Sequence, residues 1–185
     1  MNKYTEYLDF IEKQFERCFS KKGYIQEMSV PVTSKIDSTV DFIGSKISPM
    51  KKYIINENID ENGFFMIQNR LRTKALKHLK TSEPSIFGSY FKCMGVLTVP
   101  KLEHVVFDTF DYLLNYLNIP FEDIRIRISR QDEDLFKAIE NVDRRILREI
   151  DSPNANYRHK YGLDEKGITG RDFNIAIRKK IQINL

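Results

Sequence analysis

Two arginines in a basic stretch are the side chains of this chain with the clearest capacity for chemistry. Arg70 lies near the end of an aromatic and aliphatic run, Phe64–Leu71, and Arg72 opens a basic connection to a second such run, residues 85–91. A guanidinium grips phosphate or carboxylate with paired hydrogen bonds, so two strands joined here predict an anion site on a sheet face. The spacing alone favours the alternative, a surface hairpin with solvated lysines and arginines.

Further arginines occur in a strand-like segment and beside a glycine-containing loop. Residues 123–129 alternate isoleucine with Arg125 and Arg127, which predicts a strand whose arginine face borders an anionic site or is simply solvated. Arg171 ends GITGR, a loop type that cradles phosphate through backbone N–H groups but lacks the Lys-Ser/Thr ending of a P-loop. We expect Arg72 to point to the concave side of the sheet with Arg127 or Arg171 in range.

Composition bounds the class of protein without defining a reaction. The 185 residues are 41% hydrophobic, which predicts one substantial core and a single domain over residues 1–185. The net charge of +4 permits nucleic acid as a partner without demanding it. Cys18 and Cys93 have no metal-type neighbours, and no secretory leader or apolar span of about 20 residues occurs, so we expect a cytoplasmic protein with no membrane partner. The sequence has no Ser-His-Asp pattern, CxxC, HExxH or nucleophile elbow.

Hydrophobic periodicity predicts the elements that must position these arginines. Period 3.6 predicts helices over residues 2–22, 101–117 and 134–150, and residues 36–53 are predicted to be a loop, after which Ile54 and Ile55 start a strand. Period two predicts that residues 64–71, 85–91, 124–129 and 173–177 are strands. The expected fold class is α+β, one mainly antiparallel sheet with the later two helices on one side. Asp132, Glu133 and Asp134 are expected to cap the helix that follows them.

Five stretches together resemble a known family. They are residues 35–54 with an Asp-x-Thr leading to Phe and a small-residue turn, QNRLR at 68–72, FGSYFK at 87–92, the proline, strand and acidic helix start of 119–139, and the glycine loop and strand of 167–177. In order and spacing they resemble the class II aminoacyl-tRNA synthetase core, and within that class the alanyl type, from about residue 10 to 177.

The resemblance implies roles for particular residues. It implies an antiparallel sheet flanked by helices, ATP with Mg²⁺ as cofactors, and Arg72 as the motif 2 arginine that binds the α-phosphate. Gln68, Arg70, Arg127 and Arg171 are the further residues expected around the nucleotide. tRNA or a carrier would be the acceptor.

Departures from the family pattern weaken the expectation of catalysis. Leu79-Lys80 stands where the family has a Phe-Glu pair, GITGR replaces GPCGP, the tryptophan expected before that loop is missing, and the resemblance stops before motif 3. We therefore favour an ATP-, nucleotide- or RNA-binding paralogue with weak or lost aminoacylation activity. The alternatives are a minimal adenylate-forming ligase that activates an alanine-like amino acid, and a domain with a structural or oligomerisation role.

The last part of the chain predicts association. Apolar residues of one parity run from Phe173 to Leu185, and an open apolar edge is a state that proteins normally cover. We expect a homodimer or a complementing chain.

Overall fold

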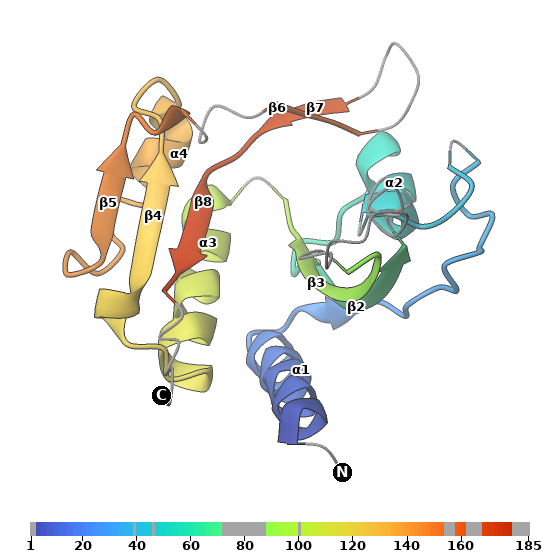
Figure 1. The fold of residues 1–185 in the computed structure, drawn as a ribbon. Coiled ribbons are helices and arrows are strands. Elements are labelled where there is room, and N and C mark those ends of the chain that lie inside the picture. Colours follow the sequence, from blue (N-terminus) through green and yellow to red (C-terminus); the bar gives the residue numbers. More distant parts are fainter. Residues whose placement is uncertain are drawn as a thin grey trace, which may run out of the picture. The chain divides into compact units, whose positions relative to one another are not determined.

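A computed structural model describes residues 3–38, 40–45, 47–71, 88–99, 101–153, 158–161 and 168–178 (Figure 1). Its described residues form two compact units: those up to Val99 belong to unit 1 and those from Lys101 onward to unit 2. Each unit is described by itself. The single domain over residues 1–185 stays a prediction.

Unit 1 is a small mixed sheet with a long helix packed on it. The helix α1 spans Lys3–Lys21, and the strands β1 (Ile25–Gln26), β2 (Phe64–Leu71) and β3 (Tyr90–Leu97) form a sheet in the order β1-β2-β3. β1 pairs with β2 in parallel, whereas β2 and β3 are antiparallel. The predicted first helix is confirmed, and Gly23, with φ +86°, ends it as a left-handed residue after the basic last turn.

The predicted loop over residues 36–53 is wrong for its second half. The helix α2 spans Ile47–Ile55, so Ile54 and Ile55 end a helix and do not start a strand. Pro49 lies in the first helical turn, where a missing N–H removes no intrahelical bond, and the sequence pattern therefore misled. Met50, the residue after Pro49, anchors the helix: it is 1% exposed and packs with Phe64 and Met66 of β2.

Unit 2 begins with the predicted helix over residues 101–117. α3 spans Leu102–Asp111 and continues as the π-helical turn η2, Tyr112–Tyr116, after which the 3-10 turn η3, Phe121–Asp123, leads into β4, Ile124–Ile128. The remaining elements are α4 (Glu133–Ala138), β5 (Leu147–Ile150), β6 (Arg158–Tyr161), β7 (Ile168–Arg171) and β8 (Asn174–Ile177). The strands predicted over 124–129 and 173–177 are confirmed as β4 and β8.

The predicted single, mainly antiparallel sheet is wrong, although the α+β class holds. β4 lies between β5 and β8 in a sheet separate from β1-β2-β3, and β6 pairs with β7 in a two-stranded ribbon. β4 and β5 are parallel because α4 carries the chain back across the sheet, and β8 is antiparallel to β4. Of the strand predicted over 85–91, the described part enters β3 at Tyr90, and the residues before 88 lie outside the described chain.

The helix predicted over residues 134–150 is wrong beyond Ala138. Isoleucines and valines continue at helical spacing, yet the chain turns after α4 and Leu147–Ile150 becomes β5. The guanidinium of Arg148 donates to the backbone carbonyl oxygens of Ile139 (3.3 Å), Val142 (2.8 Å) and Ile146 (3.0 Å). These carbonyls thus find a side-chain partner where a helix would have used the backbone.

Candidate functional site

The antiparallel pair β2–β3 carries the segment in which the sequence predicts an anion site. The pairing runs from Phe64 opposite Leu97 to Leu71 opposite Tyr90, with the connection between them at residues 72–89. Arg72 follows the last residue of β2 directly and lies outside the described residues. The strand pair that precedes and follows it is therefore the part of this site that the structure defines.

The two faces of β2 pack against different parts of unit 1. Phe65 is fully buried against α1, where its ring centroid lies 5.9 Å from that of Phe15 and 6.3 Å from that of Phe19. Phe64 and Met66 belong to the cluster with Met50 of α2. Because side chains alternate along a strand, Gln68 and Arg70 lie on the same face as Phe64 and Met66.

Gln68 is fully buried and bonds to the backbone of Val30. Its Oε1 accepts from the Val30 N–H at 2.9 Å, and its Nε2 donates to the carbonyl oxygens of Val30 (2.8 Å) and Asn69 (2.7 Å). The side-chain amide thus pairs with a backbone segment as a neighbouring strand would. Its donors and its acceptor are used in positioning the chain.

Arg70 fastens the following part of the same segment. It is 9% exposed, and its Nε and Nη2 donate to the carbonyl oxygen of Gly44 at 2.9 and 2.8 Å, while its Cζ lies 5.1 Å from the centroid of the Phe91 ring. The N–H of Leu71 donates to the carbonyl of Ile43 at 3.0 Å. Together with Gln68, Arg70 thus fixes Val30, Ile43 and Gly44 along the end of β2.

Arg127 is held in the sheet of unit 2 by a carboxylate shared with Arg125. The Nε of Arg127 lies 2.8 Å from Oε2 of Glu149, and Nη1 of Arg125 lies 3.0 Å from Oε1. The side chains of Arg125 and Arg127 remain 42% and 34% exposed. Glu149 thus hydrogen-bonds Arg125, whereas with Arg127, whose Nε is buried, it forms an ion pair without a hydrogen bond.

Arg171 is paired with two carboxylates. Its Nη1 lies 3.0 Å from Oδ1 of Asp132 and its Nη2 lies 2.6 Å from Oδ2 of Asp134. The hydrogen bond from Arg171 lowers the pKa of Asp134 below its ordinary value. Asp132 occupies the N-cap position of α4, but its side chain makes no capping hydrogen bond there and binds Arg171 instead, so for this residue the capping prediction is wrong.

The structure therefore divides the predicted site residues between the two units. Gln68 and Arg70 belong to unit 1, whereas Arg127 and Arg171 belong to unit 2. A cationic pocket of Arg72 with Arg127 or Arg171 stays a prediction.

One polar cluster had no signal in the sequence. The hydroxyl of Tyr53 donates to the carboxylate of Glu27, and the Nζ of Lys52 lies 4.4 Å from the centroid of the Tyr53 ring. A hydrogen bond with Tyr53 raises the pKa of Lys52. These residues are far apart in sequence from Glu27, and the ring of Tyr53 stacks on that of Phe64, with centroids 4.3 Å apart.

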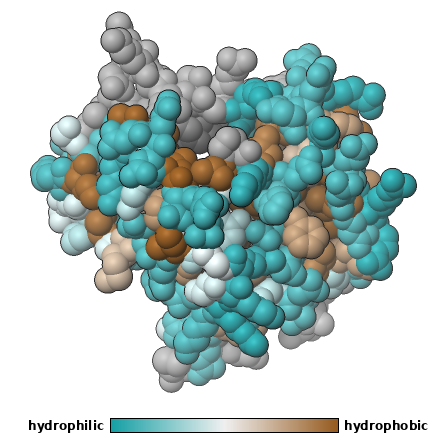
Figure 2. All heavy atoms as spheres, turned by 180° about the vertical axis from the view of Figure 1, so that it is seen from behind, coloured by the Kyte–Doolittle hydropathy of each residue, from teal (hydrophilic) through white to brown (hydrophobic). Residues whose placement is uncertain are grey.

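The described residues offer neither a metal site nor a membrane-spanning helix. Among the residues that the structure describes, no group of three or more His, Cys, Asp or Glu side chains is arranged to hold a metal ion. Within the same described ranges, no helix has the length and apolar character needed to cross a membrane. On the face seen in Figure 2, the coloured residues show hydrophobic side chains in small groups among hydrophilic ones.

Comparison with models of known protein families and with curated protein sequences finds no match for this chain.

Proposed function

We propose that this chain is a class II aminoacyl-tRNA synthetase-like core protein of the alanyl type, which binds ATP or another nucleotide through Arg72 and has weak or lost aminoacylation activity. The strongest support is the antiparallel pair β2–β3. QNRLR, which resembles part of motif 2, and FGSYFK, which resembles the family's FGDYFK, flank one connection. Their residues 68–71 and 90–92 lie in paired strands, with Asn69 opposite Lys92. Arg72 then comes directly after a strand that is fixed on both faces.

The chemistry of a motif 2 arginine fits a residue in this position. When a carboxylate attacks the α-phosphate of ATP, negative charge spreads over the phosphate oxygens, and a preplaced guanidinium stabilises that charge more in the transition state than in the ground state. Gln68 and Arg70 would support the strand and not the nucleotide, because their hydrogen bonds go to Val30 and Gly44. In such sites Mg²⁺ is held largely by the phosphates of the nucleotide, with few carboxylates.

Two departures within the chain support weak or lost catalysis. The Phe-Glu pair that contacts adenine in the family is replaced by Leu79-Lys80, and the GPCGP loop is replaced by residues 167–171. The predicted glycine loop is wrong for Ile168–Arg171, which forms the strand β7, and Arg171 at its end is already engaged by two carboxylates. Loss of one charge-stabilising group typically costs about 2.7 to 4 kcal/mol of transition-state stabilisation.

The test is calorimetric titration of ATP into the protein, with and without Mg²⁺ and alanine. A charge-assisted hydrogen bond contributes about 1.5 to 3 kcal/mol, so Arg72→Ala should weaken ATP binding by about 10- to 100-fold. Arg17→Ala is the matched control, since Arg17 is exposed on α1 and is expected to leave the affinity unchanged. Equal affinities of wild type and Arg72→Ala would require Arg72's role to be withdrawn.

A pyrophosphate-exchange assay with alanine separates this proposal from the alternative. We expect little or no amino-acid-dependent exchange. Exchange near that of a complete synthetase would instead establish the minimal adenylate-forming ligase, with tRNA or a carrier as acceptor.

We also propose that the protein forms a homodimer or pairs with a complementing chain. Support comes from β8, which lies at the edge of its three-stranded sheet with Ile177 48% exposed. Light scattering at micromolar concentration tests it. A single 21.9 kDa species, unchanged when residues 180–185 are deleted, would remove the reason for a partner.

A further inference from the structure

One face of the sheet β5-β4-β8 is cationic and is not covered by the helices of unit 2. Ile124, Ile126 and Ile128 of β4 are each 0% exposed and point to the side on which α3 and α4 lie, behind the sheet in Figure 1. The intervening residues of β4, Arg125 and Arg127, therefore point to the opposite side. We call this opposite side the arginine face.

The strand register defines the other residues of the arginine face. Residues that are directly opposite on neighbouring strands project to the same side of a sheet. Arg125 lies opposite Leu147 of β5 and Ala176 of β8, and Arg127 lies opposite Glu149 and Asn174. Leu147 is 54% exposed, so at this rung the face is open to solvent.

Glu149 orders the two arginines of β4 without covering them. One carboxylate oxygen meets Arg125 and the other meets Arg127, at 3.0 and 2.8 Å. A carboxylate so placed restricts the rotamers of both guanidiniums, which lowers the entropy that a further anion would have to remove. It neutralises only one of the two charges.

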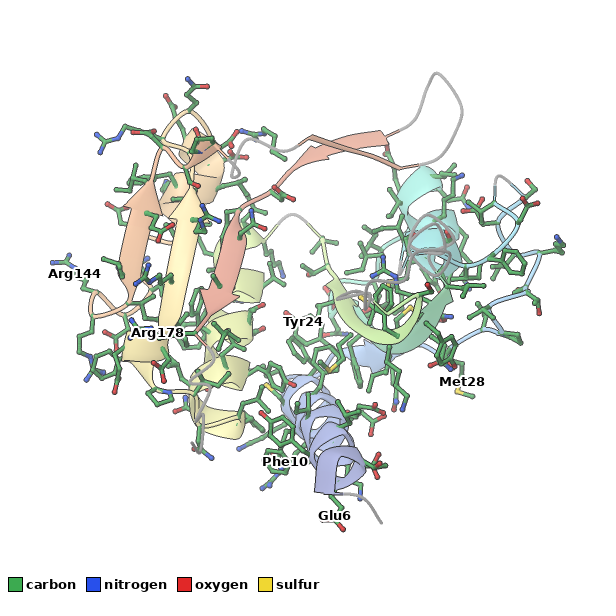
Figure 3. The ribbon with its side chains drawn as sticks, in the orientation of Figure 1. Glu6, Phe10, Tyr24, Met28, Arg144 and Arg178 are labelled. Atoms are coloured by element: carbon green, nitrogen blue, oxygen red, sulfur yellow. The ribbon has the colours of Figure 1, made fainter. Side chains whose placement is uncertain are left out.

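Two more arginines flank the start of β4. The N–H of Arg178 donates to the carbonyl of Asp123 at 2.8 Å, so Arg178 extends the pairing of β8 with β4 by one residue. It follows Ala176 by two residues and therefore lies on the arginine face. Arg144 stands in the turn before β5, at the same edge of the sheet because β5 is parallel to β4. Figure 3 labels both residues, at the end of β8 and beside β5.

Arg144 and Arg178 are not engaged by the acids at this edge, although exposed Glu122 also lies there, before β4, and its charge acts on Arg145. Both Arg144 and Arg178 are exposed, and neither has an ion pair to a carboxylate within the described ranges of the chain. Asp143, the neighbouring acid, is engaged by Arg145 at 2.6 Å. Asp123 lies at the same edge but is only 8% exposed.

We propose that the arginine face, with Arg125, Arg127 and Arg178 around Glu149, forms together with Arg144 in the turn at its end a docking surface for the phosphate backbone of single-stranded RNA. Guanidiniums match phosphate oxygens with paired hydrogen bonds, and a row of them along a sheet follows a chain of phosphates more closely than it follows an isolated anion. Contacts of this kind are sequence-independent and strongly salt-dependent. The proposal does not rest on ATP binding by Arg72, since these residues belong to unit 2.

Fluorescence anisotropy with a labelled, mixed-sequence RNA of about 20 nucleotides tests it. Each phosphate contact to a single strand contributes about 0.7 to the slope of log affinity against log salt. The double variant Arg144→Ala, Arg178→Ala should lower that slope by about 1.4. The ratio of wild-type to variant RNA affinity should therefore fall about sevenfold between 50 and 200 mM salt. The control is Lys13→Ala, Arg17→Ala, which removes two exposed charges from α1 and should leave the slope unchanged.

A second variant makes a prediction of opposite sign. Glu149→Gln removes the carboxylate from the arginine face and should tighten RNA binding, whereas a purely structural role for Glu149 gives no gain. The proposal is overturned if Glu149→Gln and the double arginine variant both bind RNA as the wild type does. It is equally overturned if polyglutamate of matched charge competes as well as unlabelled RNA, because the surface would then accept acidic chains in general.

Retained RNA binding by Arg72→Ala, with ATP binding lost, would separate this surface from the nucleotide site.

Discussion

Replacing Gln68 with leucine should destabilise the protein by about 2 to 3 kcal/mol. Leucine has nearly the same size but neither donates nor accepts, so the Val30 N–H and the carbonyls of Val30 and Asn69 lose their partners. A typical internal hydrogen bond contributes about 1 kcal/mol net, and a buried group left unsatisfied costs about 1 to 3 kcal/mol. Val30 is half-buried, so the cost of leaving its N–H and its carbonyl oxygen unsatisfied should lie near the lower end of this range.

Urea denaturation gives the free energy of unfolding for this comparison. The control is Gln26→Leu, because Gln26 is an exposed glutamine on β1 whose Nε2 donates to Glu16 at 3.2 Å. This variant should stay within about 0.5 kcal/mol of the wild type. If Gln68→Leu also remained within that range at an unchanged m value, Gln68 would not anchor the segment, and its predicted contact with the nucleotide would regain support.

Two further predictions concern a glycine and an ion pair. Gly63→Ala should destabilise the protein clearly more than Gly23→Ala. Both glycines have positive φ, which costs about 1 to 2 kcal/mol for alanine. Only at Gly63 would the added Cβ also meet the carbonyl oxygen of Leu97, at 2.8 Å. Equal losses in urea denaturation would contradict this. The hydrogen bond from Arg145 lowers the pKa of Asp143 to about 2, so the pair's stabilisation is complete above the ordinary carboxyl pKa and is lost as pH falls through about 2. Arg145→Gln should return the Asp143 pKa, followed by carboxyl NMR, towards its ordinary value, and an unchanged midpoint would refute the assignment.

Elements whose pattern depends on one strong period were predictable from the sequence. β4 alternates isoleucine and arginine, and its three isoleucines are fully buried, as a strand with one covered face requires. α1 has both an apolar stripe and a glycine stop. In such segments the local preference and the final packing agree.

Elements decided by contacts distant in sequence were not predictable. The apolar spacing after α4 fits a helix, but β5 forms because Leu147–Ile150 gains β4 as a partner and Arg148 satisfies the preceding carbonyls. The sheet assignment failed for the same reason, since nothing local separates the partners of β2 from those of β4.

The candidate site was predictable in its residue types more than in their roles. The sequence indicated polar side chains at Gln68 and Arg70 but not their burial, which arises because Val30 and Gly44 lie along β2. It indicated arginines on β4, yet Glu149 comes from a segment read as helix, and Arg144 and Arg178 were not singled out. A period-two reading of residues 147–150 would have made Glu149 a strand residue, but its register opposite Arg127 comes only from the pairing of β5 with β4.

The order of strands in unit 2 has a consequence for synthesis on the ribosome. The described residues of unit 1 all precede Lys101, so that unit emerges first and its sheet can close while the rest of the chain is still being made. The sheet of unit 2 cannot close early in synthesis. Its central strand, β4, lies between β5 and β8, and β8 is the last strand that the structure describes. Until Ile177 has left the exit tunnel, one edge of β4 has no partner strand, and a nascent chain stalled before that point would expose it to chaperones and to other chains.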